Sequence, residues 1–376
     1  MAIPFVDVKA QFTRIKADMD RRIATVMDHC KFILGPEVAE LETALASFCG
    51  AQHCISVSSG TDALLIVLMA EGIGPGDAVF LPTFTYTATA EVALLLGASP
   101  VFVDVDPDTY NIDVKHLKKQ IAATRAAGRL RPKAIIAVDL FGLPADFARI
   151  GAIAEAEGLV LLDDAAQGFG GAIGNRRIGA VAPYTATSFF PAKPLGCAGD
   201  GGAIFCNDAD KAALMRSIRF HGVGNDPYDV VRVGLNGRLD TLQAAVLLSK
   251  LTIFETELAE REALSQLYDS RLRDHVATPA RPKDMHYAWA IYTIRVKNRD
   301  GVRKYLTDHG VPTAVYYPKP MHFQAAYQSY GEGAGSCPVA ERLSGEVLSL
   351  PMHPYIDQAT AHFICDKVIE AVGQQD

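Results

Sequence analysis

The chain has 376 residues, of which 49% are hydrophobic and 21% charged, a balance that is typical of a folded globular protein and excludes a disordered one. Its length is compatible with two or three domains, or with one large α/β domain and a smaller partner. The net charge of −7 and the pI near 5.8 give no electrostatic reason to expect a nucleic-acid partner or binding to an anionic membrane.

The sequence shows no signal for export or membrane insertion. Residues 1–12 contain no basic segment followed by an apolar one, so no signal peptide is expected. The longest apolar stretches, residues 63–70 and 93–97, are too short to span a bilayer. The 7 cysteines form no CxxC pair and most lie in apolar runs. This predicts buried free thiols in a reducing cytoplasm, with neither disulfides nor a metal site.

Short β-branched runs alternate with helical segments over the first half of the chain. Residues 36–49 carry apolar side chains three and four positions apart, between a proline that suits a helix start and a glycine that suits its end. The same reasoning predicts strands or extended segments at 53–57, 78–82, 100–106, 134–142 and 159–167, and helices at 62–71, 87–97 and 145–158. This pattern predicts an α/β fold with a mostly parallel sheet covered by helices on both faces.

A different pattern begins near residue 239. A long amphipathic helix is predicted over 239–275, and it could bridge to a second domain. After the polar, proline-bearing segment 277–284, we expect a strand at 289–298, a helix at 301–310 and a strand at 313–318. The large α/β domain is therefore expected over residues 1–250. The bridging helix and a small α+β C-terminal domain are expected over 251–376.

The first candidate for chemistry is Lys193, in the sequence SFFPAKPLGCAGDGG. A lysine captures carbonyl compounds when it is presented on a constrained loop and partly desolvated. Pro191 and Pro194 constrain the backbone here, and Phe189 and Phe190 would exclude water. A solvated loop lysine is the alternative interpretation.

The second candidate is Asp164, at the carboxyl end of the predicted strand LVLLD. Ligands of open α/β sheets bind at this end of the strands, and a buried carboxylate there needs a partner. A pyridinium nitrogen would serve, and the pairing would make pyridoxal phosphate a good electron sink. Gln167 could donate to a phenolate oxygen of the same ring. The alternative is that Asp164 caps the following helix, while Asp163 alternates to the other face of the sheet.

The third candidate is the SSGTD turn at 58–62, where Gly60 lets the backbone approach a ligand and the free N–H groups of a helix start favour an anion. Most strand-to-helix junctions look similar, so the turn alone is weak evidence. Tyr86 could supply an aromatic face for a cofactor ring, or be an ordinary half-buried tyrosine. The sequence has no GxGxxG or GxxxxGK[ST] motif, which counts against a dinucleotide or P-loop site. A phosphate cradle, a carboxylate and a lysine, in this order, are the three anchors that pyridoxal phosphate needs.

These segments resemble the DegT/DnrJ/StrS family of nucleotide-sugar aminotransferases over about residues 3–370. The resemblance rests on IPFVD, ILGPEVAELE, SSGTDAL, PTFTYTATAEV, GASPVFVDVD, LLDDAAQGFG, SFFPAKPLGCAGDGGA, RFHG, GLNGRLDTLQAA, PTAVYYPKP and SLPMHPY. It implies the type I aminotransferase fold, pyridoxal phosphate bound as a Schiff base on Lys193, and homodimers with shared active sites.

The resemblance also implies roles for other residues. Asp164 would pair with the pyridinium nitrogen, Gln167 would contact the ring hydroxyl and Tyr86 would stack on the ring. The remaining expectations are phosphate binding by backbone groups of Thr61 and Asp62, by the Ser188 hydroxyl and by Asn236 of the neighbouring subunit, and contacts with the nucleotide sugar by Arg238, Tyr317 and His322.

The implied reaction is ping-pong, with L-glutamate as amino donor and a nucleotide-linked keto sugar as acceptor. SFFPAKPLGC and SLPMHPY resemble the subgroup that acts at C-3 of UDP-2-acetamido-2-deoxy-3-oxo-hexoses or hexuronates in surface-polysaccharide synthesis. The alternatives are a dTDP- or GDP-keto-sugar 3- or 4-aminotransferase and a non-catalytic family member. The intact Lys193 and Asp164 argue against the last of these. Ala198 replaces a tyrosine of the subgroup and Tyr316 a common histidine, and both changes could alter the substrate pocket.

Overall fold

The computed structural model describes residues 3–226 and 228–374. Its helices are α1 (Val8–His29), α2 (Pro36–Cys49), α3 (Gly60–Ala70), α4 (Ala88–Leu95), α5 (Val114–Ala127), α6 (Phe147–Glu157), α7 (Ala209–Arg219), α8 (Thr241–Leu272), α9 (Arg299–Asp308), α10 (Pro338–Glu346) and α11 (Gln358–Gly373). Its strands are β1 (His53–Val57), β2 (Asp77–Pro82), β3 (Ser99–Val103), β4 (Arg131–Val138), β5 (Val160–Asp164), β6 (Ala172–Ile173), β7 (Arg176–Arg177), β8 (Tyr184–Ser188), β9 (Gly202–Cys206), β10 (Met285–His286), β11 (Tyr292–Arg295) and β12 (Val347–Leu350). Short 3₁₀ turns lie at Leu140–Gly142, Met321–Phe323 and Gln328–Tyr330.

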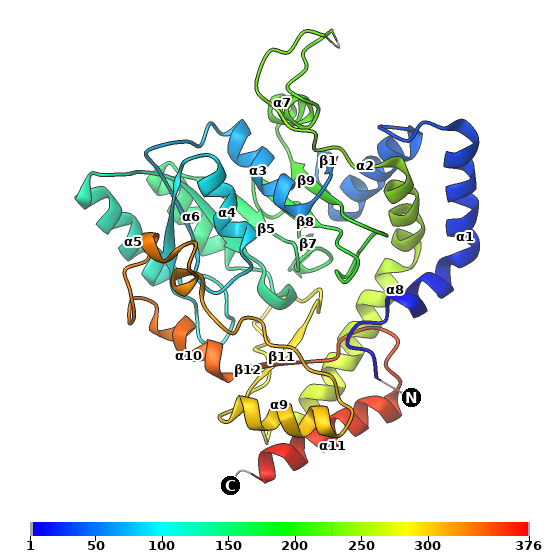
Figure 1. The fold of residues 1–376 in the computed structure, drawn as a ribbon, viewed down its shortest axis with the longest axis vertical. Helices are drawn as coiled ribbons and strands as arrows, with labels where there is room; N and C mark the ends of the chain where they lie inside the picture. Colours follow the sequence, from blue (N-terminus) through cyan, green and yellow to red (C-terminus); the bar gives the residue numbers. More distant parts are fainter. Residues whose placement is uncertain (1–2, 227, 375–376) are drawn as a thin grey trace.

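The centre of the molecule is a seven-stranded sheet with the order β1-β9-β8-β5-β4-β2-β3 (Figure 1). Strands β3, β2, β4, β5 and β8 pair in parallel, and β9 runs antiparallel to its neighbours β8 and β1. The predicted α/β fold with a mostly parallel sheet is confirmed. Because β1 has the same direction as the parallel strands, the carboxyl ends of all but β9 lie at one edge of the sheet.

Helices bury both faces of this sheet. On β4, Ile136 belongs to the core under α3, α4 and α7, whereas Ile135 belongs to the core under α5 and α6. Consecutive side chains of a strand point to opposite faces, so a strand covered on both sides must be apolar almost throughout. This explains why the strands appear in the sequence as continuous apolar runs.

Helix α8 connects the sheet domain to the C-terminal elements. Its first half packs through Leu247 and Phe254 against α2 and the edge of the sheet, and its second half packs through Tyr268 and Leu272 against β11, β12, α9 and α11. The boundary expected at residue 250 therefore falls inside a helix that contributes to both cores. The division into 1–250 and 251–376 stays a prediction.

Several expected extended segments, such as 159–167 and 289–298, are shorter in the structure, and two further segments differ in conformation. Residues 313–318 were expected to form a strand, but they make only an isolated bridge between Ala314 and Ser349. Prolines at 312 and 318 bracket the segment and lack the N–H groups that a longer ladder needs. The extended segment expected to reach residue 142 ends at Val138, because the chain turns at Leu140–Gly142 with Phe141 at a φ of 59°.

In the part of the chain that the structure describes, no helix combines the length and apolarity that a membrane crossing requires. The seven cysteines are free; Cys30 is exposed and the others are buried.

Candidate active site

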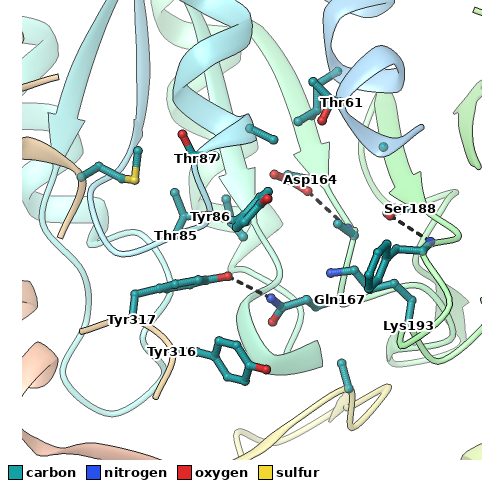
Figure 2. A pocket seen from close by; sticks show the side chains of 18 of the residues that line it. Thr61, Thr85, Tyr86, Thr87, Asp164, Gln167, Ser188, Lys193, Tyr316 and Tyr317 are labelled. Atoms are coloured by element: carbon teal, nitrogen blue, oxygen red, sulfur yellow. Dashed lines mark hydrogen bonds between the residues drawn. The ribbon is translucent and has the colours of Figure 1, made fainter. Parts of the chain in front are cut away.

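A cavity of about 930 Å³ lies at the carboxyl ends of β1, β2, β5 and β8. Its wall is formed by residues that follow these strands, by Phe5 and Val6 near the N-terminus, and by residues 315–319 of the C-terminal half. Figure 2 shows that Lys193 and Asp164 lie in this common space, although they come from different loops and strands. The parallel sheet thus gathers side chains that are far apart in the sequence.

Lys193 is partly buried and lines the cavity. Its own N–H donates to the Phe190 carbonyl at 2.8 Å, and the Cys197 N–H donates to the Phe189 carbonyl at 2.7 Å, so the loop is closed on itself. Burial lowers the pKa of the Lys193 amine from its ordinary value, and the charge of Asp164 offsets part of that effect. A lysine with a lowered pKa is present more often as the free, nucleophilic amine.

Asp164 is the last residue of β5, and only 6% of it is exposed. Its Oδ2 accepts a hydrogen bond from Thr89 Oγ1 at 2.8 Å, and its Oδ1 accepts one from the Ala166 N–H at 3.3 Å. Burial raises the pKa of Asp164, while Thr89, the Ala166 N–H and Lys193 lower it. A cationic ring nitrogen would stabilise the ionised carboxylate further. Sequence analysis missed Thr89, whose only signal was a hydroxyl near the start of a predicted helix.

The phosphate cradle is expected where α3 begins at Gly60, directly after β1. Gly60, Thr61 and Ser188 line the cavity, and the N–H groups of a helix start suit an anion. A Cβ at Gly60 would lie 2.7 Å from Ser188 Cβ, so a glycine is needed for this approach of α3 to β8. Asp62 does not line the cavity, and its N–H already donates to Ser59 Oγ at 3.0 Å. Its predicted phosphate contact therefore lacks a free N–H.

Gln167, Tyr86 and Tyr317 line another part of the cavity wall (Figure 2). Gln167 Oε1 accepts from the Phe141 N–H at 2.7 Å, and its Nε2 donates to Tyr317 Oη at 3.3 Å. The donor end of the amide is thereby directed to the cavity side. Tyr86 is 60% exposed at the cavity wall, which leaves its ring face open to a planar ligand.

Asn236 and Arg238 do not line the cavity of their own chain. They lie near the end of the connection between α7 and α8, part of which projects at the top of Figure 1. The Arg238 guanidinium lies over the Phe220 ring, 5.1 Å from its centroid. Ala198 is exposed and also lies outside the cavity wall, whereas Tyr316 is part of it. Of the two departures from the subgroup, only Tyr316 therefore bears on the cavity within one chain.

His322 was expected to face the substrate, but the structure places it behind the cavity wall. It is 2% exposed, its Nδ1 lies 2.6 Å from Thr83 Oγ1, and its Nε2 lies 3.2 Å from Glu341 Oε1. Both ring nitrogens are therefore engaged within the protein. Its neighbours Met321 and Gln324 line the cavity instead.

Together these groups fit pyridoxal phosphate. The cavity offers an amine for an aldehyde, a buried carboxylate for a ring nitrogen, a helix start for a phosphate and an exposed tyrosine for the ring face. The individual roles of these residues toward the cofactor stay predictions.

Known proteins share this architecture. The chain is 48% identical over 364 residues, 96% of its length and 98% of the relative's, to the UDP-2-acetamido-2-deoxy-3-oxo-D-glucuronate aminotransferase of Pseudomonas aeruginosa. A DegT DnrJ EryC1 StrS aminotransferase from Brucella abortus has a crystal structure with a TM-score of 0.97 and 51% identity, covering 99% of this chain and 100% of that one. NtdA of Bacillus subtilis with bound cofactor PMP has a TM-score of 0.89 and 29% identity, covering 99% and 86%. Residues 13–369 match one sequence family, which confirms the resemblance seen in the motifs: the chain belongs to the DegT/DnrJ/EryC1/StrS aminotransferase family.

Proposed function

We propose that this protein is a pyridoxal-phosphate-dependent aminotransferase that moves the amino group of L-glutamate to C-3 of a UDP-2-acetamido-2-deoxy-3-oxo-hexose or hexuronate. The observation that carries the proposal is the convergence of Lys193 and Asp164 on one cavity in a chain of this family. The name of the Pseudomonas aeruginosa relative supports the choice of sugar. The product would be an amino sugar for surface-polysaccharide synthesis in the cytoplasm.

Each cavity residue has a defined task in this reaction. When bound, pyridoxal phosphate supplies an aldehyde that condenses with amines and a ring that accepts electrons. Lys193 would provide the anchoring amine and, as a free base, carry the proton of the 1,3-shift between the amino-bearing carbon of the substrate and the aldehyde carbon of the cofactor. Asp164 would keep the ring nitrogen protonated, and Gln167 would donate to the ring oxygen. Thr61 and Ser188 would orient the phosphate.

The described part of the cavity wall carries two acidic residues, Asp164 and Asp200, and two basic ones, of which one is free to meet an anionic substrate. Among the described residues that line it, the basic ones are Lys193 and Lys319. Lys319 is exposed next to the tyrosines of the 315–319 segment. Because Lys193 is committed to the cofactor, Lys319 would meet a carboxylate of L-glutamate or an anionic group of the nucleotide sugar.

A homodimer with shared active sites would complete the cavity. Asn236 and Arg238 lie outside their own cavity, next to a projecting loop that exposes Tyr228, Val230 and Val233 at 95%, 61% and 83%. Exposed apolar groups of this kind mark an interface. A second copy that covers the loop would receive Asn236 at its phosphate and Arg238 at its substrate.

The test measures 2-oxoglutarate release from L-glutamate by the protein loaded with pyridoxal phosphate. The acceptors are UDP-2-acetamido-2-deoxy-3-oxo-D-glucuronate and dTDP- and GDP-linked keto sugars. We expect the UDP sugar to react fastest. Lys193→Ala should lower the rate by about a thousandfold or more, because it removes the anchor and the proton carrier. The control Lys297→Ala changes an exposed lysine and should leave the rate unchanged.

Other outcomes would favour the alternatives. A faster reaction with a dTDP or GDP sugar would reassign the substrate, and equal rates with all acceptors would remove the UDP specificity. Bound cofactor without turnover of any sugar would favour a non-catalytic protein.

A further inference from the structure

Two carboxyl groups lie buried next to Asp164 and are not used by the proposed reaction. Asp139 follows β4 and Asp163 precedes the last residue of β5, and both are 0% exposed. Asp139 Oδ1 accepts from the Ala145 N–H at 2.7 Å, and Asp163 Oδ2 accepts from Thr185 Oγ1 at 3.1 Å. The second oxygen of each, Asp139 Oδ2 and Asp163 Oδ1, has no donor among the described residues.

The two carboxyl groups are neighbours on one face of the sheet, because Asp163 pairs with Ala137 across β4 and β5 and Asp139 follows two residues after Ala137. Ionised carboxylates carry no hydrogen, so a hydrogen bond between the two orphaned oxygens needs a proton on one of them. Burial raises the pKa of both groups well above the ordinary value, and the charges that act on them most are their own and that of Asp164, all acidic. Like charges in contact do not both ionise in a buried site. One proton between the two orphaned oxygens gives each of them a partner.

Gly168 closes the pair off on one side. A Cβ at this position would lie 2.3 Å from Asp139 Oδ2, so the glycine backbone packs directly against the carboxyl group. The pair is therefore a dry, packed contact, in which an unshared negative charge would find no compensating solvent.

We propose that Asp139 and Asp163 share one proton and together act as positioning residues for Asp164 and Gln167. The positioning role rests on the proposed function of Asp164 and Gln167, whereas the shared proton does not depend on it.

The backbone connects the pair to both residues. The Asp139 N–H donates to the Asp164 carbonyl at 3.1 Å, which joins the ends of β4 and β5. The Asp139 side chain closes the loop 139–145 through its bond to the Ala145 N–H. Inside this loop, the Phe141 N–H donates to Gln167 Oε1 and sets the direction of its amide. A displaced pair would therefore shift the carboxylate and the amide together.

Infrared spectroscopy of the protein loaded with pyridoxal phosphate tests the proton, because a protonated carboxyl has a carbonyl band that is separate from the carboxylate bands. Asp163→Asn preserves the shape, the single negative charge and a donor toward Asp139, but needs no proton. The band should be lost in Asp163→Asn and in Asp139→Asn. The matched control is Asp77→Asn, since Asp77 is also buried, at 1% exposed, but forms an ion pair with Arg131 at 2.7 Å.

The positioning role is tested by the affinity for pyridoxal phosphate, measured by titration of its visible absorbance. Asp163→Asn should bind within about twofold of the wild type, because its amide keeps the hydrogen bond. Asp163→Leu leaves Asp139 Oδ2 unpaired and should bind about tenfold more weakly. The infrared arm uses only isosteric variants, so it decides the question of the proton even if Asp163→Leu does not fold.

Three results would overturn the proposal. These are a protonated-carboxyl band that survives both asparagine variants, a band that is lost only in Asp164→Asn, and an unchanged cofactor affinity in a folded Asp163→Leu. An intact band in a protein without aminotransferase activity would count against the proposed function alone.

Discussion

At the scale of single residues, burial sets the charge states of the groups that face the cavity. It raises the pKa of Asp164 and lowers that of Lys193, and the attraction between the two charges offsets part of each shift. Among the contacts that oppose burial at Asp164, the hydrogen bond from Thr89 has the largest effect. Thr89 is therefore the residue through which the acid limb of activity can be moved without touching the carboxylate itself.

Thr89→Val is expected to shift the acid limb of the pH–rate profile to higher pH. The Thr89 hydroxyl donates to the ionised form of Asp164 and so lowers its pKa; without this donor the pKa rises and the carboxylate ionises later as pH increases. The profile of kcat/KM against pH measures the shift. Thr89→Ser keeps the hydroxyl and should follow the wild type. If the acid limb of the valine variant does not move, the ionisation of Asp164 does not determine that limb.

At the scale of elements, the cofactor site depends on how closely the ends of neighbouring elements approach. The start of α3 touches the end of β8 at Gly60, and α8 links the sheet to the core formed by β11, β12, α9 and α11. Replacing Gly60 tests the first contact through cofactor affinity, and replacing Arg261 tests the packing of α8 through the free energy of unfolding.

Gly60→Ala should weaken the binding of pyridoxal phosphate by about tenfold or more, because the added Cβ would lie 2.7 Å from Ser188 Cβ and push α3 away from β8. Titration of the visible absorbance measures the affinity. Gly345→Ala, in α10, is the control: its Cβ would meet nothing within 4 Å. It should bind the cofactor normally and gain up to about 1 kcal/mol of stability. Equal affinities for the two variants would remove Gly60 from the cradle.

Arg261→Ala should lower the free energy of unfolding by about 2–4 kcal/mol. Arg261 is 3% exposed on α8, and its Nη1 donates to the Trp289 carbonyl at 2.9 Å and the Met352 carbonyl at 3.1 Å. The variant leaves both buried carbonyls without this donor. Urea denaturation measures the loss, and Arg303→Ala, at an exposed position of α9, is the control. A loss no larger than that of the control would show that Arg261 does not stabilise the packing of α8 against the C-terminal core.

At the scale of the whole molecule, the proposed dimer distributes one active site over two chains. Arg238 and Asn236 lie outside the cavity formed by Lys193 and Asp164 of the same chain. A symmetric dimer in which each chain completes the other's cavity is the simplest arrangement that uses all four residues.

Mixing Lys193→Ala and Asn236→Ala protein after dissociation and reassociation tests this arrangement. Each variant alone should be impaired, whereas the mixed dimer contains one cavity with both native residues. Random pairing should therefore restore about a quarter of the wild-type aminotransferase rate. The two unmixed variants, treated in the same way, are the controls. A mixture no more active than its components would show that Asn236 acts in the active site of its own chain, or in no active site.

Much of the fold was accessible from the sequence because it depends on local patterns. Apolar runs of strand length predicted the strands, and apolar side chains three and four positions apart predicted the helices. Helix α2 and strand β1 have the predicted bounds. Asp164 and Ser188 end strands, Thr61 and Lys193 follow strands, and all four line one cavity. The strand predicted at 313–318 was wrong, since a sequence that favours an extended backbone does not reveal whether a partner strand is present.

The sequence by itself determined that this chain has an α/β fold, that its candidate chemistry follows the strands, and to which family it belongs, because periodicity and motifs are properties of neighbouring residues. Only the tertiary structure decided which groups meet. It placed Thr89 against Asp164 across 75 positions of the chain, buried His322 behind the cavity wall, and set Asp139 and Asp163 on the same face of neighbouring strands. Such contacts depend on the packing of distant segments, and burial there, rather than residue type, sets the charge of each group.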